Sequence, residues 1–267
     1  MTTLLTETFD NQDLTYGGSA CYDDQFVGTS AFDSSIKYAG AYSNKNTWVE
    51  GAYYATGTGS AASRWLFTAS DRVYVSLYIR LGSDWVGSGQ SYHPHLLFLL
   101  SDTDYNTDPY CGIATNYLNC YIEPHENYLR LIIADELQTV PVHGEGTFYN
   151  VSGRNFTLGQ WYHIELWYKM NTPGQYNGEL KAWIDGVITN INYINVHYRP
   201  VEYSTMKWRT FVHASWIGDT SPQTQSMWLD DIYLGTEYLS RGKGDLLSMP
   251  SSRLCNKTNV RRLHPKI

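Results

Sequence analysis

The stretch at residues 160–187, QWYHIELWYKMNTPGQYNGELKAWIDGV, decides the fold of this chain of 267 residues. Apolar and polar residues alternate in it twice, which is the period of a half-buried β-strand. The turn-forming segment Asn171-Thr172-Pro173-Gly174 separates the two runs, and Asp185-Gly186 reverses the chain again. One face of the predicted hairpin holds Tyr162, Ile164, Leu166, Tyr168 and Met170, then Leu180, Ala182 and Ile184.

Other segments repeat the strand pattern at short spacing. Alternation predicts further strands at residues 73–81, 117–123, 128–134, 208–216 and 227–234. Residues 95–100 are almost wholly apolar, which predicts a central strand covered on both faces. Residues 188–206 are rich in Asn and Tyr, and we expect a loop or an irregular strand there. No helical period of useful length is evident, so the pattern predicts an all-β sandwich of two antiparallel sheets.

The composition agrees with such a fold and limits the partners. Aromatic residues make up 15% of the chain and charged residues 17%, which is less charge than globular domains usually carry. Rings with one polar tip suit sugar faces and also protein interfaces. The net charge of −7 argues against nucleic-acid binding. No apolar run reaches transmembrane length, so we expect no membrane insertion.

The strand pattern accounts for residues 1–239, which we predict to be one domain. Residues 240–267 are polar, basic and interrupted by Gly and Pro, and we expect them to form a tail. This tail is either disordered or an arm through which copies of the chain form a homo-oligomer. No signal peptide is visible after Met1. The expected location is extracellular, or on a virion or cell surface.

Two segments carry a resemblance to a known family. Residues 160–187, together with the closing segment MWLDDIYLG at 227–235, resemble the concanavalin-A-like jelly rolls. They are most similar to the polysaccharide lyases that cleave alginate and glucuronan. The resemblance implies a concanavalin-A-like β-jelly roll that is lectin-like in its carbohydrate-binding groove. It also implies an acidic, uronate-containing polysaccharide as the partner, although motifs that shape a fold do not define a reaction.

A polysaccharide lyase cleaves by β-elimination and needs three kinds of group. Arg or Asn donors neutralise the uronate carboxylate, which makes the proton at C5 acidic. His, Lys or Tyr removes that proton, and Tyr suits the protonation of the leaving O4. The chain holds each type on a predicted strand or at its start. The candidate catalytic residues are Arg80, His93, His95, Asn119 and Tyr121.

Further polar residues opposite the predicted core face are candidates for substrate contacts on the concave sheet. These are Tyr74, Tyr78, Glu123, Arg130 and His213. Plainer interpretations stay open: rings that pack, a pair between Arg80 and Asp84, and histidines that only mark the edge of a strand. The resemblance also implies a catalytic Lys near residues 92–95, where this chain has His93 and His95 instead.

Two other functions compete with the lyase. A glycosidase needs two carboxylates across the scissile bond, but the E-x-D-x-E strand of sandwich glucanases is missing. The pair Asp230-Asp231 on the last strand is expected to be structural. A non-catalytic glycan-binding or structural surface protein, for example of a virion, fits the aromatic content and the basic tail. We favour the lyase because all of its catalytic residue types are present.

The predicted chemistry requires no cofactor, although one pattern suits a metal ion. Asp102, Asp104, Asn106 and Asp108 alternate as D-x-D-x-N-x-D, a spacing that places oxygen ligands around a structural Ca²⁺. A solvated acidic loop is the alternative. The four cysteines match no zinc pattern. Cys111 and Cys120 flank a short segment. They either form a disulfide that bridges a hairpin or remain buried thiols.

Overall fold

The computed structural model describes residues 2–10, 12, 31–53, 55, 62–88, 95–102, 117–133, 147–217 and 220–238. In several strand segments the structure describes the backbone and its pairing, and not the side chains: 62–66, 95–102, 117–119, 121–122, 129–133, 147–150 and 212–216. The described residues form strands and one short 3₁₀ helix, η1 (Val201–Tyr203), and contain no α-helix. No helix among them is long and apolar enough to cross a membrane.

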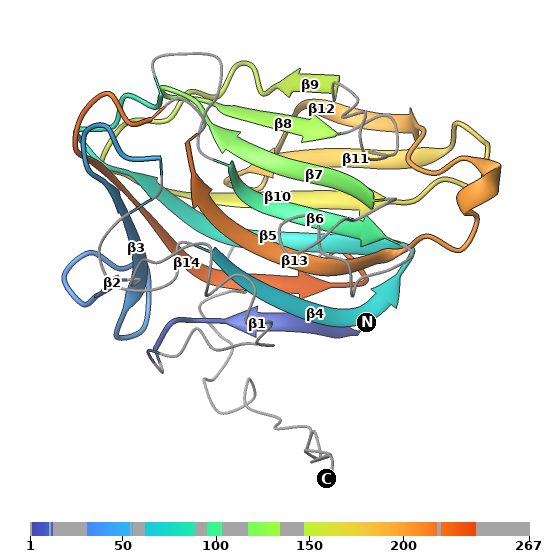
Figure 1. Cartoon of the computed structure of the whole chain (residues 1–267), viewed down its shortest axis with the longest axis horizontal. Helices are drawn as coiled ribbons and strands as arrows, with labels where there is room; N and C mark the ends of the chain where they lie inside the picture. Colours follow the sequence, from blue (N-terminus) through green and yellow to red (C-terminus); the bar gives the residue numbers. More distant parts are fainter. Residues whose placement is uncertain are drawn as a thin grey trace, which may run out of the picture.

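The strands form two antiparallel sheets that lie face to face (Figure 1). Sheet A has the order β12-β11-β10-β5-β14-β3-β2, and β1 also pairs with β14. Its strands are β1 (Thr3–Glu7), β2 (Ala31–Asp33), β3 (Ser43–Trp48), β5 (Arg72–Leu81), β10 (Trp161–Lys169), β11 (Gly178–Ile184), β12 (Val187–Val196) and β14 (Gln225–Gly235). Sheet B has the order β4-β13-β6-β7-β8-β9. Its strands are β4 (Ala62–Ser70), β6 (His95–Asp102), β7 (Tyr117–Pro124), β8 (Leu129–Ile133), β9 (Thr147–Asn150) and β13 (Trp208–Trp216). The predicted all-β sandwich is confirmed.

β10 and β11 form the predicted hairpin, in register from Ile164 opposite Ile184 onward. Gly174 in the connecting turn has a φ of 74°. Asp185 and Gly186, between β11 and β12, have φ angles of 52° and 72°. Positive φ at both central residues is what a type I′ turn requires, and Asp-Gly adopts it readily. Both reversals therefore lie where the sequence places its turn residues.

β12 is a full strand of sheet A, where the sequence favours a loop or an irregular strand. Only Ile191 and Val196 are buried in it, and its register against β11 shifts twice. Two buried residues five positions apart do not show a period of two, so alternation cannot detect this strand. β9 was likewise not predicted from the sequence.

β14 lies inside sheet A and has three neighbours. β5 pairs along one of its edges. The other edge is divided: residues 225–229 pair with β3, and residues 232–235 pair with β1. Asp230 and Asp231 lie at the division, where Asp231 has a φ of 44°. The last strand of the described chain thus pairs with the first.

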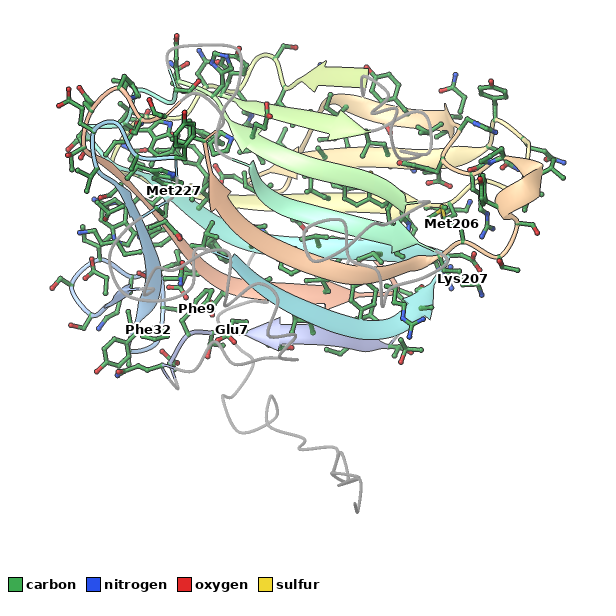
Figure 2. All side chains as sticks on the ribbon, in the orientation of Figure 1. Glu7, Phe9, Phe32, Met206, Lys207 and Met227 are labelled. Atoms are coloured by element: carbon green, nitrogen blue, oxygen red, sulfur yellow. The ribbon has the colours of Figure 1, made fainter. Side chains whose placement is uncertain are left out.

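The hydrophobic core lies between the two sheets and includes Leu77, Ile79, Leu166, Leu180 and Phe211. Met206 and Lys207 lie at one end of the sandwich and Met227 at the other (Figure 2). The start of β5 is at the Lys207 end, because Lys207 lies 3.5 Å from Asp71. The end of β5 is at the Met227 end, because Met227 pairs with Leu81.

Replacing Leu180 with Ala should lower the free energy of unfolding by about 2–5 kcal/mol, because the side chain is fully buried and its loss leaves a cavity. Val187→Ala is the matched control, since Val187 is 45% exposed on the neighbouring strand. Its effect should stay within about 0.5 kcal/mol. Urea denaturation followed by tryptophan fluorescence measures both. Equal losses would contradict the placement of β11 described here.

Candidate functional site

The structure divides the predicted site residues between the two sheets. Tyr74, Tyr78 and Arg80 lie on β5 in sheet A. The other candidates within the described residues lie in sheet B: His95, Asn119, Tyr121, Glu123, Arg130 and His213. His93 lies outside the described residues. The outer faces of two stacked sheets point in opposite directions. Arg80 is therefore not brought together with Asn119 and Tyr121.

Four of the candidates share one face of sheet B. Cys120 is buried in the core, so the alternation of β7 puts Asn119, Tyr121 and Glu123 at outer-face positions. Glu123 pairs with Arg130 on β8, which gives Arg130 a position on the same face. Tyr121 pairs with Ile132, two residues from Arg130. Diagonal neighbours of this kind have Cα atoms about 7–8 Å apart.

Apolar positions border this polar group. Tyr121 pairs with Phe98 on β6, and Phe98 pairs with Val212 on β13. The row through Tyr121 is thus apolar on β6 and β13, and its next polar position is Arg64 on β4, which pairs with Val212. Glu123, which we expected to contact substrate, is only 1% exposed. Burial therefore rules out a substrate contact for Glu123, and Asn119, Tyr121 and Arg130 keep outer-face register positions.

The two histidines of sheet B occupy inner-face register positions. Leu99 pairs with Cys120 and with Phe211, which are both buried in the core. His95 lies four residues from Leu99 on the same strand, so the alternation of β6 puts it on the Leu99 side. His213 lies two residues from Phe211. The register does not place His95 or His213 on the face of Tyr121.

A connected polar network lies on the outer face of sheet A. The Tyr74 hydroxyl donates to the Glu165 carboxylate, and the Ser76 hydroxyl lies 2.8 Å from Nε2 of His163. The other ring nitrogen of His163, Nδ1, lies 3.6 Å from Oε2 of Glu165. The His163 ring also stacks on Tyr78 at a centroid distance of 4.7 Å. Ser76 and Glu165 are almost fully buried, so the network serves as a packed support and not as an open surface.

Residues 34–42 cover part of this face, and two carboxylates hold the segment there through hydrogen bonds to its backbone. Asp230 accepts the backbone N–H groups of Tyr38 and Ala39 at 2.8 and 3.3 Å. The ring of Tyr38 then stacks on Tyr78 at 3.5 Å. Burial, with the neighbouring charge of Asp231, raises the pKa of the Asp230 carboxyl to about 7. Asp10 holds the other end of the segment by accepting the backbone N–H groups of residues 41 and 42.

Sequence reasoning did not select His163, Glu165, Ser76 or Asp230 as a connected group. The alternation of residues 160–170 already puts His163 and Glu165 opposite the core face, which was the available signal. The alternation does not show which strand pairs with residues 160–170. β10 pairs with β5 so that His163 lies opposite Tyr78 and Glu165 opposite Ser76. Only this register brings the polar groups together.

The metal and disulfide predictions fall largely outside the described residues. Asp102 ends β6, whereas Asp104, Asn106 and Asp108 are not among the described residues. Within the described ranges, no three His, Cys, Asp or Glu side chains are grouped to hold a metal ion. Cys120 is buried in the core, and both alternatives for it stay open. Its predicted partner Cys111 lies outside the described residues, and the calcium site stays a prediction.

Comparisons with known proteins define the fold class. No protein-family description matches the chain, and no curated protein matches it in sequence. An endo-β-1,4-glucuronan lyase from the fungus Trichoderma reesei has a similar structure, with a TM-score of 0.61 and 15% identity. The match covers 88% of this chain and 96% of that one. The chain is thus similar in fold to a polysaccharide lyase.

Two alginate lyases are similar to the same extent. One, from the marine animal Aplysia kurodai, has a TM-score of 0.62 and 10% identity over 89% of this chain and all of that one. The other, from a Chlorella virus, has a TM-score of 0.60 and 13% identity over 79% and 90%. The fold is the jelly roll that these lyases share, which confirms the predicted fold class. Identities this low establish the fold alone.

Asp230→Asn should flatten the pH dependence of stability. The folded protein holds the Asp230 proton more tightly than the unfolded chain does, since the pKa rises from 3.8 to about 7. This contribution to stability is complete below about pH 4 and is lost as the pH rises through 7. Between these limits the wild type should lose on the order of 4 kcal/mol more stability than the variant, because one pKa unit corresponds to about 1.4 kcal/mol. Urea midpoints at half-unit pH steps measure it. The exposed carboxyl Asp84, changed to Asn, is the control. Parallel profiles for the wild type and Asp230→Asn would contradict the assignment.

Tyr74→Phe should destabilise the fold by about 1–3 kcal/mol, because it removes the hydroxyl that donates to the buried Glu165. Tyr176→Phe provides the comparison, since Tyr176 is 73% exposed. Chemical denaturation of the two variants tests the difference. If Tyr74→Phe were as stable as Tyr176→Phe, the sheet A network would not support the fold.

Proposed function

We propose that this protein binds an acidic, uronate-containing polysaccharide and cleaves it by β-elimination on the outer face of sheet B. The observation that carries the proposal is the register of β7 and β8. It gives Asn119, Tyr121 and Arg130 positions on one face. Tyr121 is two residues from Asn119 on β7 and two residues from Glu123, the residue that pairs with Arg130 on β8. These are the residue types that elimination next to a carboxylate needs.

Each residue has a role that follows from its chemistry. Arg130 and Asn119 supply donors to the uronate carboxylate, where negative charge develops as C5 loses its proton. Tyr121, as phenolate, takes the C5 proton. The C4–O4 bond then breaks, a double bond forms between C4 and C5, and O4 leaves with a proton that the phenol returns. A single tyrosine can act as base and then as acid because the two steps follow one another.

The fold supports this assignment. The similar structures include alginate and glucuronan lyases, and one of them is an alginate lyase in complex with an alginate tetrasaccharide. Phe98 and Val212 occupy the same row as Tyr121. Apolar neighbours of this kind strengthen electrostatic interactions between a ligand and polar groups. The substrate class we propose is therefore an anionic polysaccharide with 4-linked uronate residues.

A non-catalytic glycan-binding protein is the second candidate. The separation of Arg80 from Tyr121 favours it, because the elimination set is smaller than the sequence suggests. The Lys that the family resemblance implies is also replaced by His near residues 92–95. In this case Asn119 and Arg130 would hold the carboxylate without proton transfer.

Absorbance in the unsaturated-uronate band, recorded with alginate, glucuronan and other acidic polysaccharides, tests the proposal. The absorbance is expected to rise with the wild type. The rate of this rise should be at least about 100-fold lower in Tyr121→Phe, because the proton-transfer group is lost. Arg130→Gln should also slow it, whereas Tyr176→Phe, at an exposed position, should not. A flat trace with folded wild type across the panel would overturn the lyase and leave the binding function.

A further inference from the structure

A row of four paired residues crosses the outer face of sheet A near the Met227 end. Trp161 on β10 pairs with Arg80 on β5, and Arg80 pairs with Trp228 on β14. Trp228 in turn pairs with Lys45 on β3. Rings and cations thus alternate across four adjacent strands, and we call these residues the cation–tryptophan row. Neighbouring strands are about 4.8 Å apart, which puts the two cationic positions roughly 10 Å apart.

Trp228 holds both cations in place. The Arg80 guanidinium carbon lies 5.9 Å from the centroid of the Trp228 ring, and Nζ of Lys45 lies 5.4 Å from it. The ring is itself fixed, because its indole N–H donates to Asp33 at 2.9 Å. Trp228 is buried, whereas Arg80, Lys45 and Trp161 are partly exposed. The polar ends of the row are therefore within reach of a ligand.

Among the residues that the structure describes, no carboxylate forms an ion pair with Arg80, and Lys45 interacts electrostatically with Asp33 alone. Nε of Arg80 is buried there without a hydrogen-bond acceptor. Other cations of the protein are paired: Lys169 and Lys181 contact Glu179 at 2.8 and 2.7 Å. The nearby carboxylate of Asp33 already accepts the Trp228 indole and two backbone N–H groups.

A partly buried guanidinium without an acceptor is costly. An anionic ligand would satisfy it through charge-assisted hydrogen bonds, and a carboxylate matches the two parallel N–H groups of the guanidinium. Nε is buried in either case, so a ligand would bind the terminal nitrogens of the partly exposed guanidinium. The neutral alternative, in which Arg80 only packs on Trp228, leaves its charge without a counterion. The geometry thus favours a ligand with a planar anionic group.

We propose that the cation–tryptophan row is a second binding site for an acidic glycan, on the opposite face of the sandwich from Asn119, Tyr121 and Arg130. Arg80 binds one carboxylate of the polysaccharide, and Lys45 supplies a second positive charge further along the polysaccharide chain. The Trp161 ring packs against a sugar face. The site shares its ligand class with the proposed function but requires no elimination chemistry. A long polysaccharide held at both faces would leave the protein more slowly than a short one.

Isothermal titration calorimetry of the full chain with alginate oligosaccharides tests this site. The Tyr121→Phe variant serves as the background, so that no cleavage occurs during the titration. In that background Arg80→Gln should weaken binding at this site by about tenfold or more, as expected for the loss of a charge-assisted hydrogen bond. Lys45→Gln should weaken it less, and the double variant should bind at one site in place of two.

Arg72→Gln is the matched control, because Arg72 is an exposed arginine of the same strand at the other end of the sandwich. It should leave binding unchanged, and neutral cello-oligosaccharides should give no signal that depends on Arg80. Thermal melts verify that each variant is folded, and Lys45→Gln keeps the test decisive if Arg80→Gln does not fold. Wild-type affinity and stoichiometry in folded Arg80→Gln, or in Lys45→Gln, would overturn the site. Binding that depends on Arg80 without elimination by the wild type would overturn only the lyase function.

Discussion

The pairing of β10 with β5 is the constraint on which sheet A depends. It runs without interruption from Trp161 opposite Arg80 to Lys169 opposite Arg72. Because side chains alternate along a strand, this one register decides which residues of both strands face the core. It also puts His163 beside Tyr78 and Trp161 beside Arg80. A slip by one residue would turn every one of these side chains to the other face.

The sequence predicts the strands of this fold better than it predicts their neighbours. The alternation around Leu77 on β5 and around Cys120 on β7 correctly identifies which residues face the core. It contains no information on which sheet each strand joins, because both sheets pack against the same core. Arg80 and Tyr121 were expected in one groove for this reason, and strand order separates them. Strand pairing depends on contacts distant in sequence, which local patterns do not encode.

Polarity alone also gives an incomplete view of exposure. Glu123, Glu165 and Asp230 stand opposite the core face of their strands, yet all three are buried. At sheet A the reason is visible: Tyr38 and its segment cover the strands, and Asp230 fastens that segment by hydrogen bonds. A buried carboxylate needs such donors, since burial without them is costly. The outer face of sheet A is therefore partly a second packed layer.

The divided edge of β14 determines when the protein can fold. Thr3 pairs with Gly235, so β1 and its partner strand lie at opposite ends of the described chain. β1 can therefore pair only after almost all of that chain has been synthesised. β5 also needs β14 on one side, although β10 can pair with its other side earlier. Contacts this distant in sequence slow folding, because a long loop must close first. During synthesis on the ribosome, the hairpin of β10 and β11 can form while sheet A still lacks an inner strand, and the sandwich closes only after β14 has emerged.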